Sequence, residues 1–202
     1  MPSYDYYRKA THLFSLVIPA LYWYVVPSQK TASVIIVFFT LIFILLDYLR
    51  FKSKTIKLFF SLFFDKMLKD HELKGKLTGA SWVMISSSTV IVLFSKEVAV
   101  ISLVFLSIGD TVAGLFGRNY GKVRIGNKTL EGFIAGLFSC LIISILYKPL
   151  QFSVTASGAF FGMLFETLPL PFDDNLKIPI ASSVAMSTVS YTHLTLPTNG
   201  EV

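Results

Sequence analysis

Residues 107–133 hold the densest group of side chains with chemical potential in this sequence. An apolar run from Val98 to Ile108 is followed by a carboxylate, Asp110, and a second apolar run begins at Gly132. Cations bind phosphate oxygens, and a carboxylate beside them can hold a divalent cation that accompanies a phosphate. The segment therefore predicts an anion site with a metal. Its four cations are Arg118, Lys122, Arg124 and Lys128.

The glycines of this region and of the segments after it have two readings. The patterns Gly109-x3-Ala113-x3-Gly117, Gly132-x3-Gly136 and Gly158-x3-Gly162 are typical of helices that pack closely in a membrane, and we favour packing for them. Gly121 and Gly126 flank loop cations, where a glycine backbone can approach a phosphate. Neither G-x-x-x-x-G-K-[ST] nor G-x-G-x-x-G occurs, so the common nucleotide motifs are absent.

The composition indicates an all-α, polytopic membrane protein. Of the 202 residues, 53% are hydrophobic and only 15% are charged, and the mean hydropathy is +0.66. The net charge of +6 does not indicate nucleic-acid binding, because the cations lie in short loops between apolar runs. Cys140 is the only cysteine, so no disulfide forms within the chain. We expect seven spans: Thr11–Val26, Thr31–Leu49, Leu77–Ser95, Val98–Gly117, Thr129–Tyr147, Phe152–Leu168, and one from Leu176 onward.

The lysines and arginines predict which side of the membrane each loop occupies. With these spans, fifteen of the 18 lie on the side of the N-terminus and the long loops, and Lys30, Lys96 and Lys148 lie on the other. Because basic residues are enriched in cytoplasmic loops, we expect the N-terminus and the long loops in the cytosol. Within the loop Arg50–Lys76, apolar residues recur at helical spacing, which predicts an interfacial amphipathic helix. Such a helix is either a membrane-bound linker or an entry point for a lipid.

Six carboxylates fall at the predicted cytosolic ends of spans. Carboxylates at membrane depth are costly and tend to mark function, so their position predicts one shared site at that surface. Two have a simpler explanation, because Asp47 can pair with Arg50 at i,i+3 and Asp173 can be solvated. Helices that begin on this side would also direct their N-termini there, with Asn127 or Thr129 as the cap of the span after the basic loop. The six are Asp47, Asp110, Glu131, Glu166, Asp173 and Asp174.

Several motifs together resemble the CTP-dependent lipid-alcohol kinases, the family of dolichol kinase, phytol kinase and yeast-type diacylglycerol kinase. The likeness extends over residues 8–181. Its specific part is Gly109-Asp110-x2-Ala113-x3-Gly117-x3-Gly121-Lys122 followed by Lys128-Thr129-x-Glu131-Gly132. Further matching elements are Arg8-Lys9-x2-His12, Glu72 with Gly79-Ala80-Ser81, and Glu166 with Asp173-Asp174-Asn175-Leu176-x2-Pro179.

The resemblance implies transfer of a nucleotide γ-phosphoryl group, with CTP as donor, to a lipid hydroxyl at the cytosolic surface. Such transfer relies on positioning and charge neutralisation. Asp110 is then expected to hold Mg²⁺ with Asp173 or Asp174, Glu131 to order Lys128 or bind metal, and Asp174 or Glu166 to serve as general base. The expected nucleotide-binding residues are Gly109, Thr111, Gly117, Gly121, Lys122, Arg124, Lys128, Thr129, Gly132 and Asn175. The expected lipid-binding or auxiliary residues are Arg8, Lys9, His12, Asp47, Arg50 and Glu72.

Three other functions are compatible with parts of the pattern. A phosphatidate cytidylyltransferase would also use CTP, Mg²⁺ and membrane carboxylates. An ion- or proton-coupled transporter would explain buried carboxylates, but near the midplane and on both sides. A purely structural subunit would explain the glycines but not Asp110. The residues do not distinguish polyprenol, phytol and diacylglycerol as acceptors, CTP from ATP as donor, or one oligomeric state from another.

The C-terminal segment Ser187–Val202 is polar where the last span should continue. It resembles a translated adapter or read-through tail. We therefore expect one membrane-embedded domain over residues 1–186, followed by a foreign and poorly packed tail.

Overall fold

The computed structural model describes residues 9, 11–26, 28–53 and 77–195. The greater part of the predicted amphipathic helix, together with Arg8 and Glu72, lies outside the described residues. The described residues are mostly helical, and the expected all-α class is confirmed. The elements are α2 (Val17–Tyr24), α3 (Gln29–Lys52), α6 (Gly79–Leu93), α7 (Lys96–Val104), the π-helix η2 (Phe105–Gly109), α8 (Asp110–Tyr120), β1 (Arg124–Ile125), β2 (Lys128–Thr129), α9 (Leu130–Leu146), α10 (Phe152–Thr167) and α11 (Asp174–Thr195).

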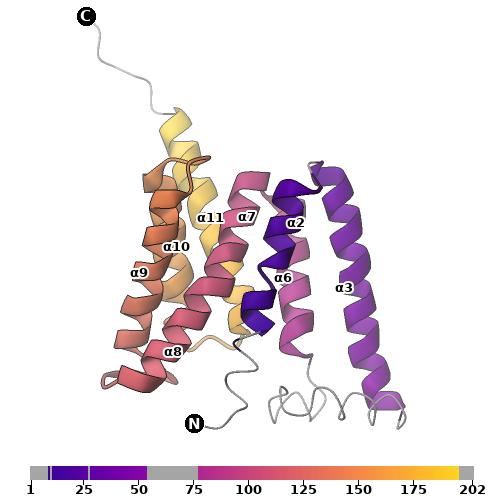
Figure 1. The fold of residues 1–202 in the computed structure, drawn as a ribbon, viewed down its shortest axis with the longest axis horizontal. Coiled ribbons are helices and arrows are strands. Elements are labelled where there is room, and N and C mark those ends of the chain that lie inside the picture. The colour runs from indigo at the N-terminus through magenta and orange to yellow at the C-terminus, as the bar shows by residue number, and fades with distance from the viewer. Residues whose placement is uncertain (1–8, 10, 27, 54–76, 196–202) are drawn as a thin grey trace, which may run out of the picture.

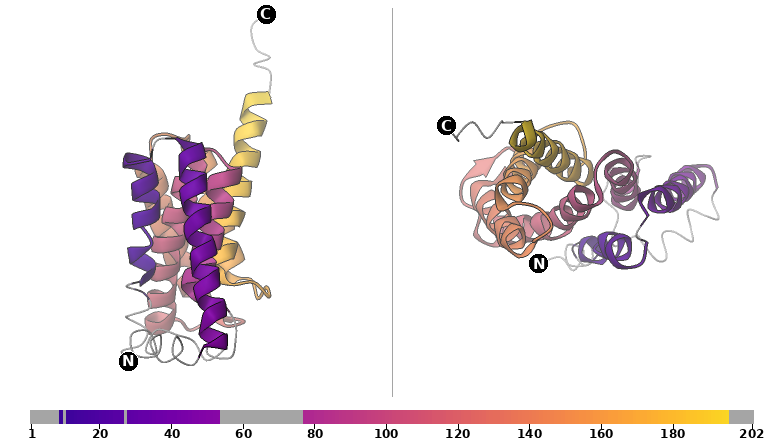
Figure 2. Two further views of the ribbon diagram at one scale, coloured as in Figure 1. Left: turned by 90° about the vertical axis from the view of Figure 1, so that its right-hand side faces the viewer. Right: turned by 90° about the horizontal axis from the view of Figure 1, so that it is seen from above.

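The helices run side by side in one bundle (Figure 1). α3 lies at one edge of the bundle, and α9 and α10 lie at the other. Seen from above, α7 to α11 form a closed group, with α2, α3 and α6 beside it (Figure 2). The start of α6, the end of α8 and the start of α11 all lie at the lower end of the bundle in Figure 1.

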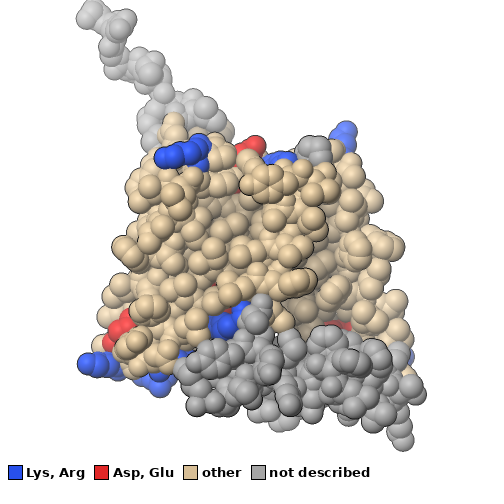
Figure 3. All heavy atoms as spheres, in the orientation of Figure 1, with Lys and Arg blue, Asp and Glu red and all other residues tan. Residues whose placement is uncertain are grey.

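Two described helical stretches are long and apolar enough to cross a membrane, Gln29–Arg50 and Lys96–Tyr120. Two further apolar helices, Gly79–Leu93 and Leu130–Leu146, are shorter. Figure 3 shows a broad uncharged band across the middle of one face, with charged atoms toward the upper and lower edges. Most of the predicted spans thus correspond to helices, but seven spanning helices stay a prediction.

The first predicted span is interrupted. Residues 11–14 and 17–24 are helical, with a turn between them. Pro19 has no backbone N–H to donate to the carbonyl of Ser15, so the helical ladder lacks a bond at this point. The carbonyl of Ser15 accepts instead from the N–H of Ile18, at 3.1 Å.

Small residues bring neighbouring helices close together, as we expected for the spaced glycines. A Cβ added at Gly132 would lie 2.7 Å from the carbonyl oxygen of Ala113, and one added at Gly117 would lie 3.4 Å from the Cα of Gly132. A Cβ at Gly158 would lie 2.5 Å from Met186, which is fully buried on α11. These glycines therefore serve the contacts of α8 with α9 and of α10 with α11.

The core consists of two clusters of buried apolar residues. One joins α7, α10 and α11 through Ile101, Met163 and Ile178, which are fully buried. The other joins α2, α3, α6 and α7, with Tyr22 and Ile91 among its members. The first cluster fixes the helices that carry the site described below.

The C-terminal segment differs from the expectation at its start. α11 continues as a helix past Ser187 to Thr195, although Pro179 lies inside it. Val189 packs against the core cluster, whereas Tyr191 is exposed. A break in the last helix at Ser187 is therefore not found. The foreign origin of the segment stays a prediction, and residues 196–202 lie outside the described residues.

Candidate active site

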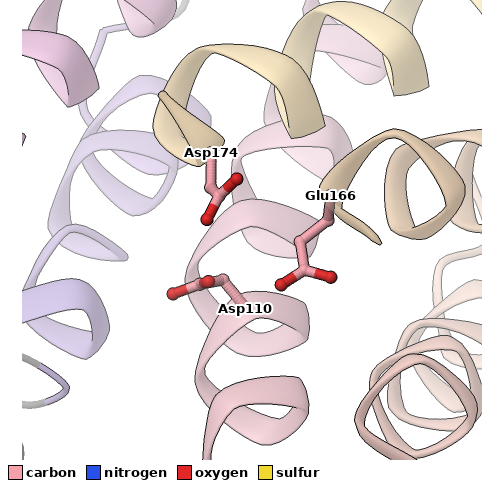
Figure 4. Close-up of side chains that lie close together, drawn as sticks. All are labelled: Asp110, Glu166 and Asp174. Carbon is pink, nitrogen blue, oxygen red and sulfur yellow. The ribbon is translucent and has the colours of Figure 1, made fainter. Parts of the chain in front are cut away.

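Three carboxylates from three helices meet at the lower end of the bundle. Asp110 is the first residue of α8, Glu166 lies in the last turn of α10, and Asp174 is the first residue of α11. One oxygen of each lies within 4.8 Å of the others, and Figure 4 shows the three side chains pointing toward one another. Asp110 and Glu166 are buried, and Asp174 is half-buried. We call this group the carboxylate cluster.

Three lysines balance the charge of the carboxylate cluster. Lys128 donates to Glu166 and, at 2.7 Å, to Asp174. Lys9 donates to Asp110 at 2.8 Å, and Lys177 lies 2.8 Å from the other oxygen of Asp174. Buried like charges are stable only when such partners are present. The cluster is thus a network of three carboxylates and three ammonium groups.

Lys128 keeps its charge in this network. Burial alone would lower the pKa of Lys128, but the carboxylates of Glu166, Asp110 and Asp174 together raise the pKa above its ordinary value. The ammonium group is therefore positive at neutral and moderately alkaline pH. The side chain retains 30% of its exposure, so a ligand arriving from solvent can reach it.

A short hairpin positions Lys128. β1 pairs with β2 in antiparallel register, with Arg124 opposite Thr129, and Gly126 takes a positive φ of 58° in the turn between them. Glycine adopts that conformation without strain. The Thr129 hydroxyl caps α9 by accepting from the N–H of Gly132, so one of the two predicted caps is confirmed. The hairpin and the helix start together place Lys128 against the carboxylate cluster.

Lys9 reaches Asp110 across 101 residues of sequence. Its ammonium group donates to the Asp110 carboxylate and, at 2.6 Å, to the Asp110 backbone carbonyl. A Cβ at Gly114 would lie 2.5 Å from this nitrogen, so the absence of a side chain there makes room for the ammonium group. His12 lies on the same side, with Nδ1 3.5 Å from the Asp110 carboxylate. Lys9 and His12 therefore lie against Asp110, and their auxiliary role stays a prediction.

A π-helical turn precedes Asp110. Residues Phe105–Gly109 form η2, between α7 and α8. Such turns are rare and are frequent at functional sites, because they rotate the following residues relative to a continuous α-helix. The Thr111 hydroxyl donates to the carbonyl of Ser107, so this predicted nucleotide ligand stabilises the helix backbone here.

Lys177 contacts the carboxylate cluster, although it was not among the residues predicted for the site. It is buried, and its ammonium group also donates to the backbone carbonyls of Leu168, at 3.1 Å, and Glu166, at 3.4 Å. It thereby ties the end of α10 to the start of α11. Its i,i+3 spacing from Asp174 was the available signal, because residues at that spacing are neighbours on a helix surface.

A cleft of about 720 Å³ opens beside the carboxylate cluster. Lys128, Glu166 and Asp174 form one part of its lining. Asn127, Trp82 and the turn of residues 167–173 form the rest, with Leu77 and Lys177. The volume lies in the range of small-molecule sites, roughly 300–1,000 Å³.

Asp47 lies in a separate buried network. Its carboxylate accepts from the N–H of Thr78 at 2.8 Å, from the Thr78 hydroxyl at 3.0 Å and from the Ser81 hydroxyl at 2.7 Å. Arg50 lies 3.6 Å away at i,i+3, as the simpler explanation predicted. Asp47 thus joins α3 to the N-terminus of α6, and we call this group the Asp47 network. Of the six carboxylates that were predicted to share one site, three come together in the carboxylate cluster.

The remaining predicted residues lie around the cluster in other roles. Asp173 accepts from the N–H of Asn175 at the start of α11, and the Asn175 amide donates to the carbonyl of Gly79. Glu131 accepts from the N–H of Val123, so it holds the hairpin, and Lys128 is ordered by Glu166 and Asp174 instead. The other predicted residues pack or are exposed: Gly109, Gly117, Gly121 and Gly132 lie at close helix or loop contacts, and Lys122 and Arg124 are exposed.

Comparison with known proteins finds similarity to lipid kinases. The chain is 28% identical over 156 residues to the CTP-dependent diacylglycerol kinase 1 of Schizosaccharomyces pombe, covering 68% of this chain and 71% of that protein. It is 32% identical over 139 residues to the enzyme of the same name from Saccharomyces cerevisiae, covering 55% of this chain and 48% of that protein. It is also 27% identical over 194 residues to an uncharacterized protein of Rickettsia prowazekii, covering 91% and 94% of the two chains. No family model and no solved structure matches the chain.

Proposed function

We propose that this protein is a membrane lipid kinase that transfers the γ-phosphoryl group of CTP to the hydroxyl of a lipid. The observation that carries the proposal is the carboxylate cluster with its lysines at one end of an apolar helical bundle. The similarity to CTP-dependent diacylglycerol kinases supports it independently. Diacylglycerol is the first acceptor to test, with polyprenol and phytol as the other members of the class.

The donor set of the carboxylate cluster fits a divalent cation. Mg²⁺ prefers oxygen ligands from one or two carboxylates, with phosphate oxygens and water as the others. Asp110, Glu166 and Asp174 offer three such oxygens within 4.8 Å of one another. When bound, Mg²⁺ supplies neutralisation of the charge on the transferred phosphoryl group. Lys128 would give up one or both of its present partners, because its ammonium group lies among the same oxygens.

The three lysines would have two different roles, binding a phosphate and positioning the carboxylates. Lys128 is charged and partly exposed, so it can hold a phosphate of the donor once it turns from the carboxylates. Lys9 keeps the backbone and side chain of Asp110 in place. Lys177 holds Asp174 and the end of α10 in register, which fixes the mutual positions of Glu166 and Asp174.

The lipid hydroxyl loses its proton as the new phosphate ester forms. Glu166 and Asp174 are the carboxylates placed beside Lys128, and we propose one of them as the acceptor of that proton. The bond between the γ-phosphorus and the bridging oxygen of CTP breaks, and the leaving group is cytidine diphosphate. We propose that the site faces the cytosol, and the uneven distribution of lysines and arginines supports this side for the basic hairpin.

The position of the label in the product tests the reaction. The 202-residue protein in lipid nanodiscs is incubated with CTP labelled at either the α- or the γ-phosphate, and with each of the three lipid alcohols or with phosphatidate, the acceptor that a cytidylyltransferase needs. The proposal predicts label in the lipid from γ-labelled CTP alone. Label transferred from the α-position would indicate a cytidylyltransferase and overturn the assignment.

A further inference from the structure

The cleft beside the carboxylate cluster has a part that the phosphoryl-transfer chemistry does not use. Trp82, in the first turn of α6, and Leu77 lie on one side, and the turn of residues 168–172 completes the lining. Asn127, at the tip of the hairpin, is exposed and also lines it. This part of the cleft contains an aromatic side chain, an amide and a set of apolar side chains.

We propose that this part of the cleft binds the base and ribose of the nucleotide, with Trp82 against the base and Asn127 at its polar edge. The proposal rests on the proposed function and assigns its donor subsite. The nucleotide would then extend from Trp82 toward Lys128, with its phosphates at the carboxylate cluster.

The charged residues of the lining favour one orientation of the nucleotide, with its phosphates at the charged part of the cleft. Glu166, Asp173 and Asp174 face the cleft with two lysines, Lys128 and Lys177. Three carboxylates against two ammonium groups would repel a bare triphosphate, whereas a triphosphate that carries a divalent cation is accommodated. The rest of the lining is uncharged. A ligand with a charged end and an uncharged, planar end matches this division.

Two prolines restrict the backbone of the turn of residues 168–172 in the uncharged wall. Pro169 and Pro171 alternate with Leu168, Leu170 and Phe172, and proline fixes the backbone φ angle. A Cβ at Gly126 would lie 3.6 Å from the ring of Pro169, so the hairpin turn packs beside this wall. A preformed wall lowers the entropic cost of binding. Aromatic and flat apolar surfaces of this kind suit a base, because every base presents a π-face for stacking.

The position of the cleft favours a soluble ligand over a lipid chain. Its lining comes from loops and from helix ends: the start of α6, the hairpin, the last turn of α10 and the start of α11. No mid-helix residue of the described bundle contributes to it. Lys9 and His12 contact Asp110 from outside this lining. The position of the cleft at the helix ends thus fits the nucleotide.

Tryptophan fluorescence tests the assignment directly. The chain has two tryptophans, and Trp23 packs on Tyr147, roughly 20 Å along the bundle from Asp110 by the length of α7 and η2. In a Trp23→Phe protein, Trp82 is the only tryptophan. Titration of this protein in nanodiscs with Mg²⁺ and CTP should quench its emission saturably. Mg²⁺ with inorganic triphosphate should compete with CTP for the phosphate end without quenching.

Substitutions give the second measurement. Trp82→Leu should weaken CTP binding about 5- to 150-fold, the range for loss of one base-stacking contact, whereas Trp82→Phe should retain most of it. Both variants should leave the KM for the lipid unchanged. Asn127→Ala, at an exposed position, should weaken binding of CTP without affecting folding.

The outcomes separate this inference from the proposed function. Binding of radiolabelled CTP with no change in Trp82 emission would place the base elsewhere and overturn the inference while the kinase assignment stands. Quenching of Trp82 by diacylglycerol in the nanodisc, but not by CTP, would make the cleft a lipid site and also overturn it. Absence of any CTP binding, together with the loss of label transfer, would overturn the proposed function itself.

Discussion

Asp47 and Asp110 are two buried aspartates at the same end of the bundle, and their surroundings differ in kind. Asp47 accepts from one backbone N–H and two hydroxyl groups, all on Thr78 and Ser81 at the start of α6, and lies near Arg50. Asp110 is held by the long, flexible side chain of Lys9 and lies beside two further carboxylates. The Thr78 N–H is fixed to Asp47 by the backbone at the start of α6, whereas a lysine side chain can move away, which leaves the carboxylate free to bind a cation. We infer that fixed donors make a carboxylate structural and movable ones leave it available for chemistry.

The largest loss of activity is expected when the same substitution is made at Asp110 and at Asp47 and the two rates are compared. Asp110→Asn keeps the size of the side chain and removes its charge, so transfer of the γ-label should fall about 10³-fold or more, because charge neutralisation dominates phosphoryl transfer. The same substitution at Asp47 should leave the rate per folded molecule near its original value. Rates are compared at equal amounts of folded protein, measured by size-exclusion chromatography. Equal losses in the two variants would remove the distinction.

Lys128→Met should separate binding of the cation from catalysis. It removes a phosphate contact, so kcat/KM should fall roughly 10- to 150-fold, which corresponds to a barrier higher by about 1.5–3 kcal/mol. It also removes the ammonium group that competes for Glu166 and Asp174, so Mn²⁺, measured by electron paramagnetic resonance, should bind more tightly than to the original protein. Because the pKa of Lys128 is raised, the difference should persist unchanged from pH 7 to 9.

Lys128→Arg is the matched control for that variant. It keeps the positive charge between the carboxylates, so Mn²⁺ affinity should stay close to that of the original protein. Weaker Mn²⁺ binding in Lys128→Met would contradict the idea that lysine and cation share one position.

The sequence predicted the members of the carboxylate cluster better than their partners. Asp110, Glu166 and Asp174 lie in recognisable motifs at the ends of apolar runs, and the positions of helices α6 to α10 follow from hydropathy. The pairing of Lys9 with Asp110 depends on how helices 101 residues apart pack, which local patterns do not specify. The π-turn before Asp110 has no proline or other local signature in Phe105–Gly109. The prediction that six carboxylates share one site included too many residues. A carboxylate can be buried at a helix end because it belongs to a shared site or because it accepts from the start of another helix. Asp47 is buried for the second reason.

The Asp47 network predicts a loss of stability. Asp47→Ala would leave the N–H of Thr78 and two hydroxyl groups without their acceptor, at about 1–3 kcal/mol for each buried group that stays unsatisfied. Thermal unfolding in detergent should therefore shift to lower temperature. Ser81→Ala removes one donor and keeps the acceptor, so it should cost less. An Asp47→Ala protein that unfolds normally but no longer binds lipid would return Asp47 to the auxiliary role first predicted for it.

Gly114→Ala gives the smallest and most specific effect. Its Cβ would lie 2.5 Å from the nitrogen and 2.7 Å from Cε of Lys9, so the ammonium group must shift and lose one of its two hydrogen bonds to Asp110. Activity should fall about 2- to 10-fold, the equivalent of one hydrogen bond. The free energy of unfolding should not fall, because alanine is more favourable than glycine in a helix interior by about 1 kcal/mol. The decisive measurement is a double-mutant cycle: in a Lys9→Ala background, Gly114→Ala should have no further effect on the rate, since the group it displaces is gone. An undiminished loss in that background would mean that Gly114 acts through the packing of α8, and the movable partner of Asp110 would have to be sought elsewhere.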